Sequence, residues 1–234
     1  MAQNCSHDCT LCLHKLCMKR IPVFSDLKKD DLEQLAKRII HEQHPKGTLI
    51  LRSEEKADNL IIINSGEAKA YRYTFDGKEQ ILYLFSEGDF FGEQGLFNDA
   101  HSDYSVEALT PLNICRLYRS DFQDLLKKHP EIALQIITAL SQRLAGLEQL
   151  ISLQDIDARI QAFLIELVAK YGGKHKDGYL VRLPLSREGM ANYLGIARET
   201  VSRKLKQLES DGSIKLIGTK HILIPNIENL KPVI

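Results

Sequence analysis

The stretch LSREGMANYLGIARETVSRKLKQLESDGSIKLIGTKHILIP, residues 185–225, decides the fold of the C-terminal part of the chain. Ser186 is a residue type that caps helices, and it precedes a short helical pattern that ends at Gly195, where the chain can turn tightly. A second helical pattern follows, with apolar residues at i, i+4 and i+7. These residues are Val201, Leu205 and Leu208. The two patterns predict a helix-turn-helix.

Two short apolar runs follow this motif. The runs SIKLI and HILIP lie beyond the turn signal Asp211-Gly212 and are joined by GTK. Short β-rich runs with a turn between them predict a two-stranded hairpin. This hairpin would form a wing beside the second helix, so we expect a winged helix-turn-helix.

The side of the second predicted helix that faces away from its apolar residues is rich in side chains that can read DNA. This stripe and its flanks carry Arg198, Glu199, Ser202, Arg203, Lys204 and Lys206. Arginine suits guanine O6 and N7, and glutamate accepts from cytosine N4. Between Arg182 and Lys220, eight Lys and Arg residues stand against four Asp and Glu residues, which leaves a net charge of +4. Solvated charged faces are also common on helix pairs, so spacing alone leaves DNA binding open.

The composition of the whole chain indicates a globular protein with room for two domains. The chain has 234 residues, and its 31 Lys and Arg residues are balanced by 31 Asp and Glu residues. A net charge of zero argues against a protein that coats nucleic acid with its whole surface. No run approaches the ~20 apolar residues of a membrane span, and no segment has the apolar core of a signal peptide. We therefore expect a cytoplasmic protein.

Residues 48–117 alternate short apolar runs with turn signals. The runs are TLILR, NLIIIN, AKAYRYT, QILYLF and NICRLY, and the turn signals include SGE, DGK and EGD. Asp76-Gly77 between two β-rich runs is a strong hairpin signal. Many short strands at near-regular spacing predict an antiparallel barrel or jelly roll.

The pattern becomes helical after Ser120, which we expect to cap a helix, and Pro130 is expected to begin a second helix. In this second helix, apolar residues recur at steps of three and four. They are Ile137, Leu140, Leu144, Leu147 and Ile151. The spacing predicts either a dimer seam or an ordinary helix face packed on its own barrel. A further amphipathic helix follows and ends at Gly172-Gly173.

Four of the five cysteines lie within thirteen residues near the N-terminus. They are Cys5, Cys9, Cys12 and Cys17, and the fifth, Cys115, lies in a predicted strand. In a reducing cytosol, clustered thiols indicate metal binding or redox chemistry rather than structural disulfides. Four thiolates can hold a cubane iron-sulfur cluster, or they can hold zinc, for which His7 and His14 offer nitrogen ligands. The spacing does not choose between these metals.

The sequence LGIARETVSR at 194–203 resembles the recognition helix of the CRP/FNR family of bacterial transcription regulators, whose signature is Glu-Thr-x-Ser-Arg. The resemblance covers nearly the whole chain and implies an α+β protein. Its parts would be a Cys-rich sensor arm at 1–20, an antiparallel, cyclic-nucleotide-binding-like β-roll at 21–120, a long dimerisation helix region at 121–155 and a winged helix-turn-helix DNA-binding domain at 156–234. The resemblance also implies a regulator rather than an enzyme, a homodimer, and RNA polymerase as a partner.

Within this resemblance, Glu199, Ser202 and Arg203 match the base-reading residues of the FNR branch. The match implies palindromic sites in double-stranded DNA with TTGA-type half-sites. Arg198 stands where that branch has an apolar residue and where the cAMP receptor branch has an arginine. Ala197 stands where the family has a Ser or Thr helix cap, and this loss should cost about 1 kcal/mol of local stability.

Residues 89–108, DFFGEQGLFNDAHSDYSVEA, align with the cyclic-nucleotide cassette of the family. Gly92 and Glu93 keep the Gly-Glu pair of the cassette, but its Arg-Ser pair falls on SDY at 102–104. A carboxylate repels a cyclic phosphate where an arginine would form a bidentate contact. We therefore do not expect cAMP to be the ligand.

By the same resemblance, three N-terminal cysteines and one from the β-roll would hold an oxygen-labile 4Fe-4S cluster that controls DNA binding. These ligands would be Cys9, Cys12, Cys17 and Cys115, with Cys5 a spare thiol. The interval from Cys12 to Cys17 is one residue shorter than in the FNR archetype. The alternatives are zinc at the same site, or a thiol-disulfide switch that uses Cys5 or Cys115.

Two other classes of protein fit the sequence less well. An iron-sulfur or zinc enzyme would need an acid, a base or a nucleophile, and the nearest candidates, His41 and His44, belong to no recognisable catalytic set. A cyclic-nucleotide-binding subunit of a kinase or channel would need the missing arginine, and it would not need a DNA-reading helix.

Overall fold

The structure is a computed structural model that describes residues 21–25, 27–98, 100–153 and 155–230. The N-terminal cysteines predicted as metal ligands lie outside these described residues. They are Cys9, Cys12 and Cys17, together with the spare Cys5. No helix in the described part of the chain is long and apolar enough to cross a membrane.

The chain divides into two compact units. Unit 1 comprises residues 1–72 and 83–140, and unit 2 comprises residues 73–82 and 141–234.

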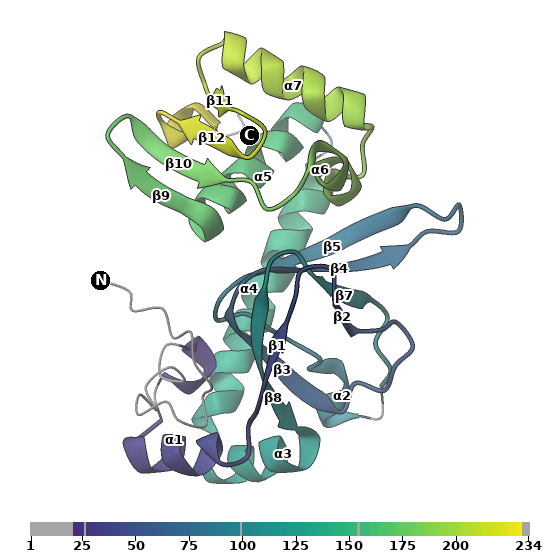
Figure 1. Ribbon diagram of the computed structural model, residues 1–234, viewed down its shortest axis with the longest axis vertical. Coiled ribbons are helices and arrows are strands. Elements are labelled where there is room, and N and C mark those ends of the chain that lie inside the picture. The colour runs from purple at the N-terminus through teal and green to yellow at the C-terminus, as the bar shows by residue number, and fades with distance from the viewer. Residues whose placement is uncertain (1–20, 26, 99, 154, 231–234) are drawn as a thin grey trace. The chain divides into compact units, whose positions relative to one another are not determined.

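Two antiparallel sheets of four strands form the body of unit 1, except that residues 73–82 of the hairpin between β4 and β5 are grouped with unit 2 (Figure 1). Their orders are β1-β8-β3-β6 and β2-β7-β4-β5. The strands are β1 (Ile40–His44), β2 (Leu49–Leu51), β3 (Asn59–Ser65), β4 (Ala68–Tyr73), β5 (Glu79–Phe85), β6 (Phe90–Phe91), β7 (Ser105–Ala108) and β8 (Leu112–Tyr118). The apolar run Leu60 to Ile63 in β3, which lies between β8 and β6, is wholly buried. The predicted antiparallel architecture is confirmed.

The turn between β4 and β5 lies at the predicted hairpin signal. Gly77 has a φ of +75°, which glycine adopts without steric cost. The Thr74 amide donates to the Lys78 carbonyl at 2.9 Å. The Asp76 carboxylate accepts from the Lys78 ammonium at 2.8 Å and from the Thr74 hydroxyl at 2.5 Å, and these contacts lower the pKa of Asp76 to about 2. The hairpin prediction is confirmed.

One hydrophobic cluster of unit 1 joins the start of the described chain to the sheets and to the helices after them. The elements involved include η2 (Pro22–Phe24), α1 (Lys29–Ala36), α2 (Gln94–Phe97), α3 (Arg119–Lys128) and α4 (Glu131–Ser152). Its buried members are Ile21, Val23, Phe24, Leu27, Leu32, Leu35, Ile39, Leu60, Ile62, Phe90, Leu96, Cys115, Leu117, Phe122, Ile132 and Ile136. We call this group the core cluster. Through Ile132 and Ile136, one turn apart, α4 begins against it.

The start of α3 differs from the prediction. Strand β8 continues to Tyr118, and α3 begins directly at Arg119, so Ser120 is the second residue of the helix and not its cap. The prediction was wrong because the cap position is set by where the strand ends. Pro130, which was predicted to begin the next helix, immediately precedes the first residue of α4.

Unit 2 contains a winged helix-turn-helix (Figure 1). Its elements after α4 are α5 (Ile156–Tyr171), β9 (Gly172–His175), β10 (Gly178–Arg182), α6 (Arg187–Leu194), α7 (Arg198–Ser210), β11 (Lys215–Ile217), β12 (His221–Ile224) and η3 (Ile227–Leu230). The strands form one antiparallel sheet in the order β11-β12-β10-β9. The predicted wing, β11 and β12, is therefore half of a larger sheet. Its other half was missed because GGKH and GYLVR show little apolar alternation.

Candidate DNA interface and sensor core

The helix-turn-helix is set by local contacts at its two junctions. The Ser186 hydroxyl accepts from the Gly189 amide at 3.1 Å, so Ser186 caps α6 as predicted. Gly195 ends α6 in the left-handed conformation, with φ +64° and ψ +38°. A side chain on a residue in that conformation costs roughly 1 kcal/mol or more, so glycine fits this turn. The turn then leads directly into α7.

The recognition helix α7 has one buried side and one exposed polar side. Val201 and Leu205 are each 1% exposed, and Leu208 is half-buried. The predicted base-reading residues on the other side are exposed at Arg198, Glu199 and Arg203 and half-buried at Ser202, and Lys206 is exposed as well. Ala197 provides no side-chain cap for α7, because its methyl group cannot accept a hydrogen bond. The structure therefore presents the polar stripe of α7 as the sequence predicted.

Lys204 does not share this stripe. Its ammonium lies 2.6 Å from a carboxylate oxygen of Asp157 in α5 and 3.4 Å from the side-chain oxygen of Gln207. Its side chain is only 23% exposed. The sequence placed Lys204 at the flank of the DNA-reading face, but it lies toward α5.

Contacts from α5 position the helix-turn-helix, and no sequence pattern predicts them. The rings of Phe163 and Tyr193 are 4.9 Å apart, and the Tyr193 hydroxyl donates to Glu166 at 2.8 Å. The Arg159 guanidinium donates to the carbonyl of Leu194, the last residue of α6. These contacts join residues 27 to 35 positions apart, so no local pattern contains them.

Cys115 lies inside unit 1, on β8. It is 1% exposed, and its Sγ lies 3.3 Å from Nδ1 of His41, its partner on the neighbouring strand β1. Ile21 belongs to the same core cluster as Cys115. The predicted strand cysteine is therefore buried, in a cluster that also contains Ile21, the first described residue.

A charged contact lies next to this cysteine on the same two strands. The Arg116 guanidinium donates to both carboxylate oxygens of Glu42, at 2.6 and 3.1 Å. His44 lies 2.9 Å from one of the same oxygens. The bond from Arg116 lowers the pKa of Glu42, against the effect of burial and with help from His44. His41 therefore contacts Cys115, and His44 contacts Glu42.

The segment that aligns with the cyclic-nucleotide cassette has Ser102, Asp103 and Tyr104 where the Arg-Ser pair would fall. Gly92 has a φ of +83°, and a Cβ there would lie 2.4 Å from the Asn59 carbonyl oxygen. Asp103 is exposed and accepts from Gln94 at 3.0 Å. Tyr104 is 3% exposed, and its ring packs edge-on against Tyr83 with centroids 6.0 Å apart. A carboxylate and a buried phenol therefore occupy the segment that aligns with the Arg-Ser pair.

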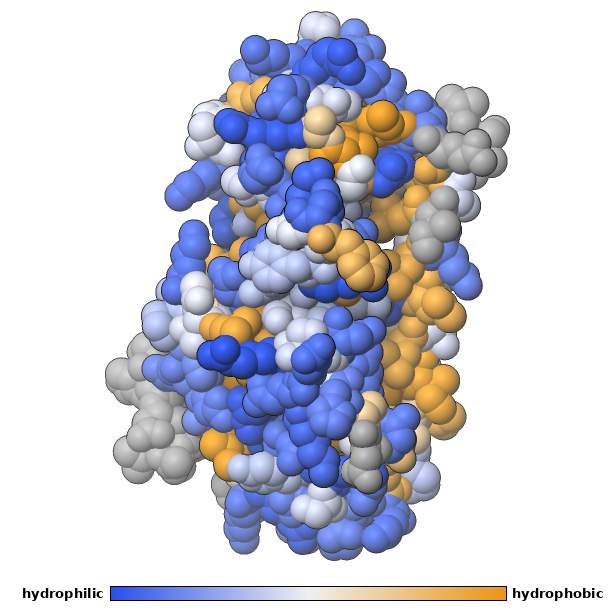
Figure 2. All heavy atoms as spheres, turned by 90° about the vertical axis from the view of Figure 1, so that its right-hand side faces the viewer, coloured by the Kyte–Doolittle hydropathy of each residue, from blue (hydrophilic) through white to orange (hydrophobic). Residues whose placement is uncertain are grey.

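The predicted seam of α4 divides into packed and exposed residues. Ile137 and Leu144 are each 57% exposed, and Leu134 is 66% exposed. Leu140 instead packs against the core cluster, and Leu147 is half-buried. The side chain of Ile151 lies outside the described part of the chain. Hydrophobic side chains gather along the right-hand edge of Figure 2, the side on which α4 lies.

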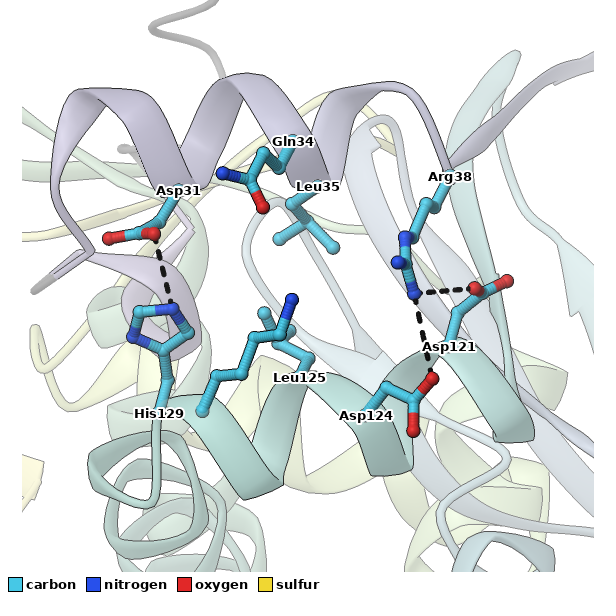
Figure 3. Close-up of a pocket in the computed structure, with 9 residues that line it drawn as sticks. Asp31, Gln34, Leu35, Arg38, Asp121, Asp124, Leu125 and His129 are labelled. Carbon is cyan, nitrogen blue, oxygen red and sulfur yellow. Dashed lines mark hydrogen bonds and ion pairs between the residues drawn. The ribbon is translucent and has the colours of Figure 1, made fainter.

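Helices α1 and α3 face each other across a small polar cavity (Figure 3). Arg38, just after α1, places Nη1 3.0 Å from Asp121 and 3.9 Å from Asp124. At the other end, His129 Nε2 lies 3.4 Å from Asp31. The cavity volume of about 30 Å³ suits water rather than a nucleotide. These ion pairs tie the segment after the arm to the helix that leads into α4.

Two family models match the two parts of the chain. A cyclic nucleotide-binding domain matches residues 41–129, and a Crp-like helix-turn-helix domain matches residues 158–233. Among solved structures, FixK2 from Bradyrhizobium japonicum is similar with a TM-score of 0.72 and 24% identity, over 84% of this chain and 98% of that chain. This likeness concerns the fold.

Curated relatives match nearly the whole chain. The probable transcriptional regulator flp of Lacticaseibacillus casei is 32% identical over 218 residues, 92% of this chain and 96% of the relative. The fumarate and nitrate reduction regulatory protein of Vibrio cholerae is 29% identical, over 95% of this chain and 88% of the relative. A CRP-like cAMP-activated global transcriptional regulator of Mycobacterium tuberculosis is 28% identical, over 91% and 96%. With a winged helix-turn-helix, a β-roll and a 32% identical relative along its length, the chain belongs to the CRP/FNR family of DNA-binding transcription regulators, which are not enzymes.

Proposed function

We propose that this regulator binds TTGA-type palindromes as a homodimer and that an oxygen-labile 4Fe-4S cluster controls its DNA affinity. The cluster ligands would be Cys9, Cys12, Cys17 and Cys115. The observation that carries the sensing part is the core cluster, which contains both Cys115 and the first turns of α4.

The described residues fit such a ligand set. Cys115 offers a thiol that is shielded from bulk solvent, as suits a ligand whose surroundings tune a metal. Ile21, in the same core cluster, is four residues from Cys17, and four residues span at most about 14 Å. When bound, the iron-sulfur cluster supplies the oxygen-reactive iron and sulfide of the sensor.

The path from this site to the dimer runs along α4. Ile132 and Ile136 pack in the core cluster, and Ile137 and Leu144 on the same helix are exposed. An arm ordered on the core cluster would therefore stabilise the position of α4 in which its exposed face can pair. Sensing and DNA binding are then coupled reciprocally, because both favour the paired state.

The DNA-reading part of the proposal rests on the exposed stripe of α7. Arg203 offers the bidentate contact to guanine, Glu199 accepts from cytosine, and Ser202 is permissive. Two copies of α7 in a symmetric dimer would read the two half-sites of a palindrome about one helical turn apart. RNA polymerase is the proposed partner at the promoter.

We also propose that cAMP is not the effector. The support is the segment at 102–104, where Asp103 is exposed and Tyr104 packs on Tyr83. A titration with cAMP should leave the gel shift of a palindromic duplex unchanged. A cAMP-dependent gain in affinity would contradict this part of the proposal.

The main experiment is purification without oxygen. We expect brown protein that contains iron and sulfide and that binds an inverted TTGA duplex as a dimer, and air should abolish both the colour and the binding. Cys115→Ser should lose the colour, whereas the matched variant Cys5→Ser should keep it. Colourless anaerobic protein with stoichiometric zinc would overturn the iron-sulfur proposal.

A second candidate is the same regulator gated by zinc. It is favoured by His41, whose Nδ1 lies 3.3 Å from Cys115 Sγ, because a thiolate with a neighbouring imidazole suits zinc. In that case His41→Phe should lower the zinc content.

A thiol-disulfide switch would instead give a metal-free protein whose DNA affinity changes when dithiothreitol is added.

A further inference from the structure

Lys204 differs from the neighbouring cations of α7 in the direction of its side chain. Consecutive helix residues are about 100° apart, so Lys204 lies that far around α7 from Arg203. Its ammonium is 2.6 Å from the Asp157 carboxylate and 3.4 Å from Gln207 Oε1. Lys206, two residues on, is exposed. Two lysines that look alike in the sequence therefore have different surroundings.

The contacts with Asp157 and Gln207 use two of the three donors of the Lys204 ammonium and hold it toward α5. A charge-assisted hydrogen bond at this distance is among the stronger polar contacts in proteins. Only 23% of the Lys204 side chain is exposed, so the ion pair is partly shielded from water. An ammonium that reached for a DNA phosphate would leave Asp157 without this partner and facing a polyanion.

The first turn of α5 holds the helix-turn-helix at a second point. Arg159, two residues after Asp157, donates to the carbonyl of Leu194 at the end of α6. Asp155 fixes this turn by accepting from the Ala158 amide at 3.0 Å. One capped turn of α5 therefore contacts both the end of α6 and the flank of α7.

We propose that Lys204 is a positioning residue that, with Asp157, sets the orientation of α7 on α5, and that it is not a DNA contact. The inference rests on the DNA binding of the family and is independent of the iron-sulfur proposal. It replaces the sequence-based assignment of Lys204 to the DNA-reading set.

Orientation of α7 matters most for base reading. A bidentate contact between Arg203 and guanine needs a fixed geometry, whereas attraction to phosphates tolerates movement. Loss of the ion pair should therefore weaken binding to a specific site more than binding to random DNA. Loss of a phosphate contact would weaken both alike and would lower the salt dependence.

The test uses the full-length protein, a duplex that the wild type selects from a random pool, and a scrambled duplex. Affinity is measured for both duplexes over a range of salt concentrations. The variants are Lys204→Met, Asp157→Asn and the two combined, with Lys206→Met as the matched control. Lys204→Met keeps the apolar stem of the side chain and removes only its charge.

We expect Lys204→Met and Asp157→Asn each to weaken specific binding about fivefold, with no further loss in the double variant, because the two residues form one contact. Their salt slopes should equal that of the wild type, whereas Lys206→Met should lower the slope by about one. A lower slope for Lys204→Met, or tighter binding by Asp157→Asn, would overturn the proposal.

A charge-reversed pair keeps the proposal testable if one of the single variants fails to fold. Lys204→Asp combined with Asp157→Lys keeps an ion pair across the same two helices. It should recover most of the specific affinity that Lys204→Asp alone loses. If the reversed pair binds no better than Lys204→Asp, the positioning role is wrong.

Discussion

Helices α4 and α7 bury similar ridges but differ on the sides that they expose. In α4, Ile132 and Ile136 pack into the core cluster, while Ile137 and Leu144 are each 57% exposed. The exposed side of α4 that carries Ile137 and Leu144 is therefore hydrophobic.

Helix α7 buries Val201 and Leu205 in the same manner. Its exposed residues are charged, and they include Glu199, Arg203 and Lys206. Its exposed face is therefore polar.

The difference indicates what each face contacts. Apolar side chains gain roughly 25 cal/mol for each Å² removed from water, and a second apolar surface provides that burial. Charged side chains gain most from a partner of complementary charge and hydrogen-bonding pattern, such as the edges and phosphates of DNA. The buried ridges hold each helix in place. The apolar exposed face of α4 suits a second copy of the chain, and the polar exposed face of α7 suits DNA.

The strongest test of this comparison replaces apolar residues on the exposed face of α4 with charged residues. Ile137→Asp with Leu144→Asp should give a monomer and weaken palindrome binding by about 100-fold or more, because the two recognition helices would bind independently. Sedimentation velocity and a gel shift measure the two effects. Gln142→Asp, on the other side of α4, is the control. If this double variant stays dimeric, the exposed face of α4 does not form the dimer contact.

The proposal divides the polar face of α7 into base-reading and phosphate-binding residues. If Arg203 reads a base, Arg203→Ala should lose ~1 to 3 kcal/mol of discrimination at one base pair, because the proposed bidentate contact with guanine disappears. Lys206→Ala should weaken binding to all sequences alike and lower the salt slope by about one. Competition between duplexes with single substitutions measures both. Equal losses on random DNA for the two variants would remove Arg203 from the base-reading set.

Two glycines compare the turn that leads into α7 with the backbone of α4. Gly195→Ala places a methyl group at a φ of +64° and should destabilise the protein by ~1 to 2 kcal/mol in urea unfolding. Gly146→Ala, in α4, meets no atom within 4 Å and should stabilise by ~0.5 to 1 kcal/mol. Opposite signs are expected because only Gly195 is in the left-handed region. A neutral Gly195→Ala would contradict this account of the turn.

The last expected effect concerns the unit that supports the start of α4. The Arg116 bond lowers the pKa of Glu42 in the folded state, so the pair stabilises unit 1 at pH values above the unfolded pKa of glutamate. That stability is lost as the pH falls through the lowered folded pKa. Between about pH 6 and pH 3, wild type should lose roughly 1 kcal/mol more than Glu42→Gln in urea unfolding. Parallel pH curves would show that the pair contributes nothing.

Local features of the helix-turn-helix were predictable from the sequence. Ser186 accepts a hydrogen bond from an amide three residues away, and Gly195 adopts a left-handed backbone conformation that favours glycine. Both features depend only on residues close in the sequence, so local patterns predict them. The Asp76-Gly77 hairpin was predictable for the same reason. Ser120 shows the limit, because the extent of the preceding strand decides where α3 begins.

Periodicity predicted the seam of α4 but could not sort its members. Leu140 and Leu144 occupy equivalent steps in the sequence, yet Leu140 packs against the core cluster and Leu144 is exposed. The sorting depends on where the β-roll ends beside the helix. The domain limits and the metal ligands stay predictions.

By itself the sequence determined the recognition helix, its exposed stripe and the antiparallel β architecture, because hydrophobic spacing and turn residues act over a few positions. Only the tertiary structure decided that Lys204 pairs with Asp157, that Arg159 holds the end of α6, and that Cys115 lies beside His41. These contacts join residues 35 to 74 positions apart. The physical reason is that a polar or thiol side chain takes its role from whichever element packs against it, and that neighbour is chosen by the burial of the whole core.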